Sequence, residues 1–133
     1  MHSIGYKKRK SSKNIKKYKD EIARLSKSRQ ALLEVLFSKE KLILGSYKET
    51  RMRCGSPGCH CHKDGGHPTM RISHWEDGKL RGKVVRLDDR KWVAEASANY
   101  RAHKQALREI SELDSHIKGV LKLLIEQKAQ IYE

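Results

Sequence analysis

Residues 54–68 read CGSPGCHCHKDGGHP and hold four metal-binding side chains in the pattern C-x4-C-x-C-x5-H. These four candidate ligands are Cys54, Cys59, Cys61 and His67. Zinc takes thiolate and imidazole donors in tetrahedral structural sites, and glycine and proline permit the sharp turns that four donors in one loop require. We therefore expect residues 51–68 to form a zinc knuckle around one structural ion.

The fourth ligand is open, because His60 and His62 alternate with the cysteines and compete with His67. We favour His67, since the preceding pair of glycines can turn the chain back toward the metal. Free surface cysteines, a redox-sensing thiol cluster and an iron–sulfur site are alternatives. A Cys–His enzyme would need an orienting third group and an oxyanion site, and a catalytic zinc an open position. We expect no enzymatic activity.

The positive charge is concentrated at the start of the chain. Of the net +14, residues 1–53 carry +11, from 16 Lys and Arg against five Asp and Glu. Such asymmetry indicates a polyanionic partner, and nucleic acid is the expected one, with no small-molecule substrate. A tail that only solvates the protein is the alternative. The cations expected to contact nucleic acid are Lys7, Lys8, Arg9, Lys10, Lys13, Lys16, Lys17, Arg51, Arg53, Arg71, Arg81 and Lys83.

Cellular location follows from what the sequence lacks. No apolar run approaches the roughly 18 residues of a membrane span, and residues 1–20 contain no apolar stretch of a secretory signal. Three cysteines within eight residues fit a compartment in which thiols stay reduced. We expect a cytoplasmic, nucleoid-associated protein with no membrane partner.

Apolar residues recur at steps of three and four over residues 13–44 and 89–131, which predicts two long helices with coiled-coil stripes. Gly45 is expected to cap the first helix. Returning antiparallel, the helices would place Arg29 opposite Asp114, either as a register device or as two unrelated polar residues that the helices tolerate.

Between the helices, residues 69–87 predict a β-hairpin that follows the knuckle, because Asp77-Gly78 is a strong hairpin turn. The predicted fold is mainly α: a long antiparallel helical hairpin with an inserted zinc knuckle and a short β-hairpin at its tip. Residues 1–12 would be a disordered basic arm, and residues 13–133 a single domain.

The stretch Arg53-Cys54-Gly55-x-Pro57-x-Cys59-x-Cys61 resembles an uncharacterised family of short prokaryotic proteins, commonly encoded near transposases, whose core reads R-C-G-x-P-x-C-x-C. Further similarity lies in Gly45-Ser46, Gly66-His67-Pro68, Gly78-Lys79-x-Arg81 and Asn99-Tyr100-Arg101. The chain departs from the family at residues 69–72, where members often show paired aromatics, and in its basic extension at residues 1–20. The resemblance implies an association with mobile DNA and no known activity.

Together these features predict a zinc-stabilised nucleic-acid-binding accessory protein of a transposon, phage or related mobile element, with DNA favoured over RNA as its partner. The alternative is a non-enzymatic adaptor that docks on a larger transposase or nuclease through its helical hairpin, in which case the basic arm only supports the complex; transposition is the process expected in either case. A homodimer of two hairpins is a further alternative.

Overall fold

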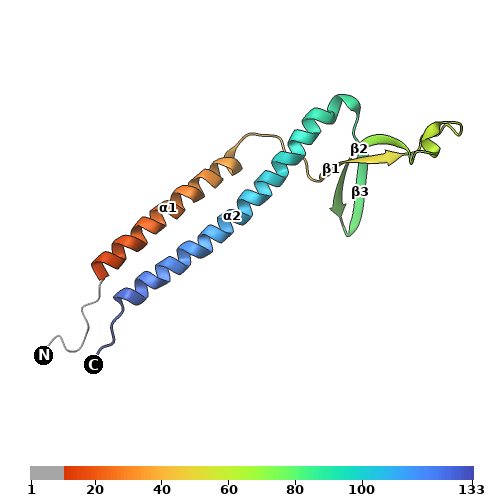
Figure 1. Cartoon of the computed structure of the whole chain (residues 1–133). Coiled ribbons are helices and arrows are strands. Elements are labelled where there is room, and N and C mark those ends of the chain that lie inside the picture. The colour runs from red at the N-terminus through yellow and green to blue at the C-terminus, as the bar shows by residue number, and fades with distance from the viewer. Residues whose placement is uncertain (1–10) are drawn as a thin grey trace. The chain divides into compact units, whose positions relative to one another are not determined.

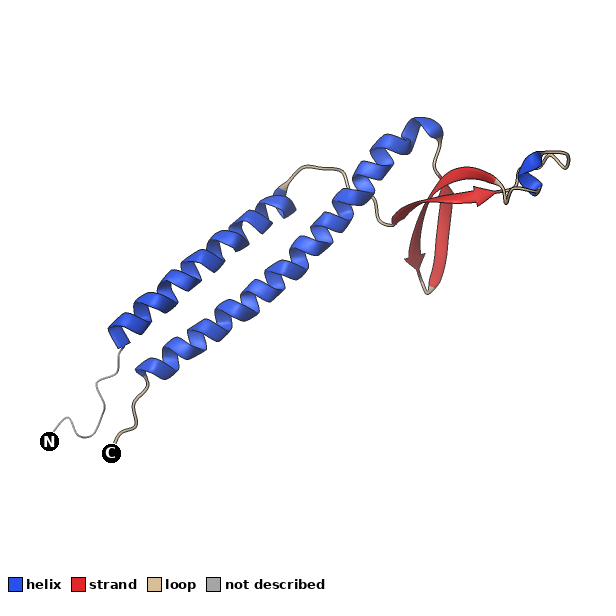
Figure 2. Cartoon of the chain, viewed as in Figure 1, coloured by secondary structure: helices blue, strands red, loops and turns tan. Residues whose placement is uncertain are grey.

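The computed structural model describes residues 11–133, which form two helices and one antiparallel sheet (Figures 1 and 2). In chain order the elements are α1 (Ser11–Phe37), β1 (Ser46–Met52), a 3-10 turn (His60–His62), β2 (His67–Glu76), β3 (Lys79–Val84), a 3-10 turn (Leu87–Asp89) and α2 (Arg90–Lys128). Residues 1–10 of the predicted basic arm lie outside the described residues, and the helix already begins at Ser11.

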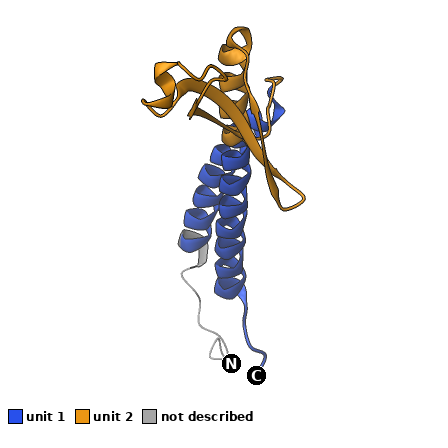
Figure 3. Cartoon of the chain, turned by 90° about the vertical axis from the view of Figure 1, so that its right-hand side faces the viewer, with its two compact units in different colours: residues 1–38, 104–133 blue, residues 39–103 orange. Residues whose placement is uncertain are grey.

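The chain divides into two compact units (Figure 3). Met1–Ser38 and Lys104–Glu133 form the helical unit, and Lys39–His103 forms the sheet unit. Within the part of the chain that is described, neither helix is long and apolar enough to cross a membrane.

In the helical unit, α1 and the C-terminal part of α2 lie side by side and antiparallel. Asn14 Nδ2 donates a hydrogen bond to Gln127 Oε1 over 3.1 Å, near one end of the pair. Arg29 Nε donates to Asp114 Oδ1 over 2.7 Å, so the predicted contact is confirmed, although both side chains are partly exposed at 38% and 49%. The buried apolar side chains of this unit are Leu25, Ala106, Ile110 and Val120.

The first helix ends seven residues earlier than the predicted residue 44. Past Phe37 the chain has no regular secondary structure up to residue 44, and Ile43 N–H donates to Ala96 O of α2 over 3.1 Å. Gly45 is not a helix cap, because α1 has already ended at Phe37; instead the carbonyl of Gly45 accepts from the buried Ser97 hydroxyl over 2.9 Å. Bonds to α2 have replaced the last turns of helix that the periodicity predicted.

The predicted fold class is wrong, because the insert is a three-stranded antiparallel sheet in the order β1-β2-β3 and not a two-stranded hairpin. The molecule combines α and β structure. Residues 46–52, for which the sequence predicted no strand, pair with β2 from Ser46↔Ser73 to Met52↔His67. A lone hairpin is marginal in water, and β1 satisfies backbone groups that β2 would otherwise leave unpaired. The predicted turn is confirmed, with φ of 52° at Asp77 and 77° at Gly78, as a type I′ hairpin requires.

The strand register divides the sheet into two faces, because paired residues project to the same side. The covered face carries Met70 and Ile72 together with Val85, which follows β3 and is buried. Ile72 and Val85 line one cavity with the buried Val93 of α2. This face of the sheet therefore packs on the first turns of α2.

Candidate metal centre

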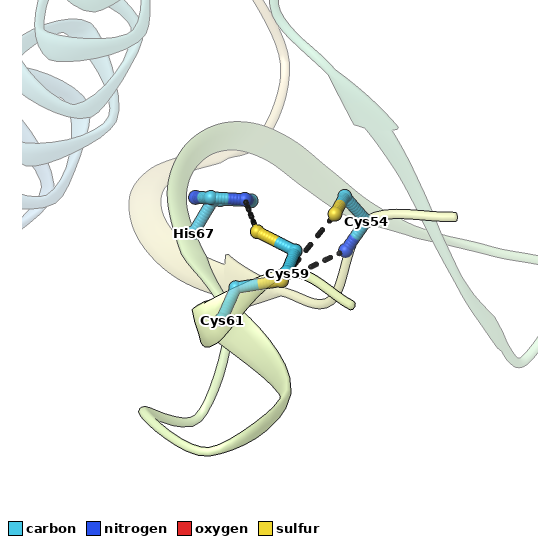
Figure 4. Close-up of side chains that lie close together, drawn as sticks. All are labelled: Cys54, Cys59, Cys61 and His67. Carbon is cyan, nitrogen blue, oxygen red and sulfur yellow. Dashed lines mark hydrogen bonds between the residues drawn. The ribbon is translucent and has the colours of Figure 1, made fainter. Parts of the chain in front are cut away.

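The four predicted ligands come from one loop that is closed by the pairing of β1 with β2. Cys54 follows the end of β1 by two residues, Cys59 and Cys61 flank the first residue of the 3-10 turn, and His67 opens β2. Because Met52 pairs with His67, the strands hold the two ends of this loop together. The loop thus returns to its starting point with all four side chains on its inside (Figure 4).

The donor atoms of these side chains all lie within 4.8 Å of one another. Cys54 Sγ and Cys61 Sγ are 3.4 Å apart, and Cys59 Sγ lies 3.2 Å from His67 Nε2. Around a tetrahedral ion with metal–sulfur bonds of about 2.3 Å, donor atoms are separated by roughly 3.5–3.8 Å. Small displacements would bring the four donors to that spacing, so the arrangement is compatible with one metal ion.

The loop around the donors is ordered by its own backbone hydrogen bonds. Cys59 N–H donates to Ser56 O over 3.1 Å, and His62 N–H donates to Cys59 O over 3.2 Å. Cys54 N–H donates to the sulfur of Cys61, which is only 1% exposed. The cysteines are therefore held in place by the fold.

Gly66 allows the close approach of the loop to β1. Its φ is +110°, and a Cβ at this position would come within 2.7–2.9 Å of the backbone N, C and O of Met52. Only glycine fits there, one residue before His67. This is the bend that the Gly-Gly sequence predicted.

Hydrogen bonding separates the pKa values of two of the thiols. Hydrogen bonding with the backbone of Ser56, helped by Cys61 and His67, lowers the pKa of Cys54 to about 6. For Cys61, the backbone N–H of Cys54 lowers the pKa, but burial and the neighbouring Cys54 and Cys59 thiols raise it by more, and the net shift is upward. Of these two thiols, Cys54 is thus the more ready to bind a cation.

His60 and His62, the competing candidates, lie outside the cluster. His62 Nε2 donates to Ser56 O over 2.9 Å. His60 places its ring edge-on to the ring of His67, with 5.8 Å between centroids. Among residues 11–133, the structure brings His67 alone of the three histidines to the cysteines.

The predicted nucleic-acid contacts fall in different places. Lys7, Lys8, Arg9 and Lys10 lie outside the described residues, as does the side chain of Lys13. Lys16 and Lys17 are exposed on α1 in the helical unit, and the sheet unit holds the other five.

Within the sheet unit the five cations do not share one surface. Arg51 and Arg53 are exposed beside the cysteine loop, and Arg51 Nε lies near Gly65. By register Arg81 and Lys83 belong to the covered face, and Arg71 to the opposite one. Lys48, which sequence reasoning missed, is the registered partner of Arg71. The alternation of apolar and polar residues in Ser46–Met52 is too weak to have predicted this strand, so no sequence signal placed Lys48 on the sheet.

A family model described as a domain of unknown function (DUF6788) matches residues 14–95, which include the whole cysteine loop and the sheet. Neither a curated protein nor a solved structure matches the chain.

Proposed function

This chain belongs to the DUF6788 family, whose function is unknown, and we propose that it is a zinc-stabilised, DNA-binding accessory protein of a transposon, phage or related mobile element. The observation that carries the proposal is the cluster of three cysteines and one histidine beside a sheet with several cations that have no carboxylate partner within residues 11–133. A zinc ion bound by the cluster would hold the cysteine loop in its fold, and the cations of the sheet would contact phosphates of the DNA.

Zinc is the metal that best fits the donors. Three thiolates and an imidazole in a tetrahedral arrangement suit zinc, whereas calcium and magnesium prefer oxygen ligands. Four protein donors leave no coordination position for water or substrate, and this supports a structural ion and a protein without enzymatic activity.

The charge on the sheet unit supports an anionic partner. Arg51, Arg53 and Lys83 are exposed, and within residues 11–133 none of them has a carboxylate within 4.0 Å. Arg81 is the exception, since its Nε lies 3.5 Å from Glu76 Oε2. Cations left without acidic partners are available to phosphate groups, which dominate nucleic-acid affinity. The basic residues 7–17 would add to this contact.

Zinc binding is tested by metal analysis of the purified protein. We expect one zinc per chain in the wild type and a loss of tight binding in His67→Ala. His60→Ala and His62→Ala are matched controls from the same loop, and both should keep the metal. Full zinc retention in His67→Ala would contradict the assignment of His67, and a metal-free wild type prepared under reducing, zinc-replete conditions would contradict the zinc site.

DNA binding is tested by measuring the affinity for a duplex at several salt concentrations. The variant K7Q/K8Q/R9Q/K10Q removes four candidate phosphate contacts, so the slope of log K against log salt should become smaller by about 3.6. The control K91Q/K118Q/K122Q/K128Q removes four charges elsewhere and should leave the slope unchanged. A wild type without affinity for any nucleic acid would refute the proposal, and equal slopes in the two variants would refute the role of the arm.

An adaptor function is the second candidate, and a groove in the helical unit, lined by both apolar and polar side chains, favours it. The groove lies between α1 and α2 and has Leu32, Val35 and Leu113 among its lining residues. Outside the groove, Leu121, Leu123 and Ile125 of α2 are exposed. A transposase or nuclease helix, or a second copy of this chain, could cover such surfaces. A stable protein complex that forms after nuclease treatment, together with no affinity for DNA, would favour the adaptor.

A further inference from the structure

The face of the sheet opposite the covered face carries an unusual combination of side chains. We call it the open face. Among the residues that the register places on it are Lys48, Arg71, Trp75, Leu80, Gly82 and Val84. The register places neither aspartate nor glutamate on it, since Glu49 and Glu76 fall on the covered face. The open face is therefore cationic and apolar at once.

The apolar part of the open face is centred on Trp75. Trp75 pairs directly with Leu80 across β2 and β3, and their exposed fractions are 70% and 60%. Val84, 45% exposed, lies farther along the same face of β3. Large apolar side chains gathered on one exposed face typically mark a binding surface.

The cationic part consists of two directly paired residues. Arg71 on β2 and Lys48 on β1 are opposite one another in the register. Like charges directly opposite in a sheet are destabilising. Neither residue has a carboxylate within 4.0 Å among residues 11–133. An anion bound between the two cations would relieve this repulsion.

Gly82 gives the guanidinium of Arg71 its place on the sheet. A Cβ at position 82 would lie 2.9 Å from Arg71 Nη2 and 3.0 Å from Ser73 Oγ. Arg71 Nη1 also lies 3.7 Å from Met52 Sδ of β1. The guanidinium thus lies close to Gly82, which the register places between Leu80 and Val84 on the open face of β3.

We propose that the open face binds single-stranded DNA, with a base stacked on Trp75 beside Leu80 and backbone phosphates held by Arg71 and Lys48. The inference rests on the proposed function. It adds that the open face is the DNA-binding surface and that the DNA is single-stranded. A single strand fits better than a duplex because a tryptophan face can stack only on a base that is free of its neighbours. Stacking of this kind tolerates different sequences.

The first experiment uses the fluorescence of Trp75. The chain has two tryptophans, so Trp92→Phe leaves Trp75 as the only one. Titration of this variant with oligothymidylate should quench its emission, because the base stacks on the indole. If Trp92→Phe fails to fold, the wild type compared with Trp75→Phe gives the same reading, since quenching should then be lost only in Trp75→Phe.

The second experiment measures the affinity for a labelled oligothymidylate by anisotropy. Trp75→Ala should bind about 5- to 150-fold more weakly, while Trp75→Phe keeps part of the affinity. Tyr132→Ala, which removes a fully exposed aromatic residue elsewhere, should bind as the wild type does. Arg71→Ala should reduce the salt slope by about 0.7, and the exposed Arg108→Ala should not. Circular dichroism checks the folding of each variant.

The outcomes separate this inference from the proposed function. If the wild type binds duplex DNA but oligothymidylate neither quenches Trp75 nor distinguishes Trp75→Ala from the wild type, the inference is wrong and the proposed function stands. Absence of binding to any nucleic acid refutes both. Tighter binding of oligouridylate than of oligothymidylate would overturn the assignment to DNA, and a protein that covers Trp75 in place of an oligonucleotide would overturn the inference.

Discussion

The substitution Gly66→Ala tests the geometry of the cysteine loop, the segment between β1 and β2, directly. The added Cβ would lie 2.7–2.9 Å from three backbone atoms of Met52, closer than Cβ atoms approach other atoms in proteins. Met52 cannot move away easily, because it is paired with His67 between β1 and β2. Alanine would also have to adopt a φ of +110°.

The two effects have known sizes. A non-glycine residue in such a conformation costs about 1–3 kcal/mol, and overpacking costs about 1–3 kcal/mol more. The sum is about 2–6 kcal/mol, and it destabilises the closed conformation of the cysteine loop. Because metal binding and loop closure share one free energy, zinc affinity should fall by about 30-fold to more than 10,000-fold.

Competition with a chromophoric zinc chelator measures this affinity. Gly58→Ala is the matched control, since it lies in the same loop and a Cβ there has no neighbouring atom within 4 Å. The control should bind zinc as tightly as the wild type. If Gly66→Ala binds zinc as tightly as the wild type, Gly66 does not lie against the backbone of Met52 in the zinc-bound loop, and this geometry is refuted.

Three further predictions concern the helices and the thiols. Leu25→Ala, at a site that is 3% exposed, should lower the free energy of unfolding by about 2–5 kcal/mol in urea denaturation, and Leu123→Ala, at a 45% exposed site, by no more than about 1 kcal/mol. Equal losses would contradict the assigned core. A double-mutant cycle on Arg29→Ala and Asp114→Ala should give a favourable coupling that weakens with added salt, whereas strict additivity would argue against their 2.7 Å contact. In zinc-stripped protein, the rate of alkylation of Cys54 should rise with pH to a midpoint near 6. Because this pKa lies below the ordinary value of 9.0, the Cys54 thiolate stabilises the folded state fully above pH 9, and this stabilisation is lost as the pH falls through about 6. An alkylation midpoint near 9 would rule out the hydrogen bonding at Ser56.

Signals confined to a few neighbouring residues gave correct predictions. The cluster of three cysteines with His67 could be predicted because the four side chains and the turns at the glycines lie in one short stretch, which ends at His67. The Asp77-Gly78 turn was equally local. Helical periodicity even predicted the contact of Arg29 with Asp114, because two regular helices leave few registers to choose from.

Tertiary structure decided what local signals could not. Strand β1 exists because residues 46–52 pair with a segment beyond the metal loop, and its own residues alternate only weakly between apolar and polar. The helix predicted to reach residue 44 ends at Phe37, because the following segment exchanges helical hydrogen bonds for bonds to Ala96 and Ser97 of α2. The pairing of Lys48 with Arg71 on an open face depends on that same strand. By itself the sequence determined the cluster of three cysteines with His67, the turn and the presence of two long helices, since each depends on residues close along the chain or on a regular repeat. The third strand, the end of α1 and the open face depend on partners far apart along the chain, and only the folded structure brings those partners together.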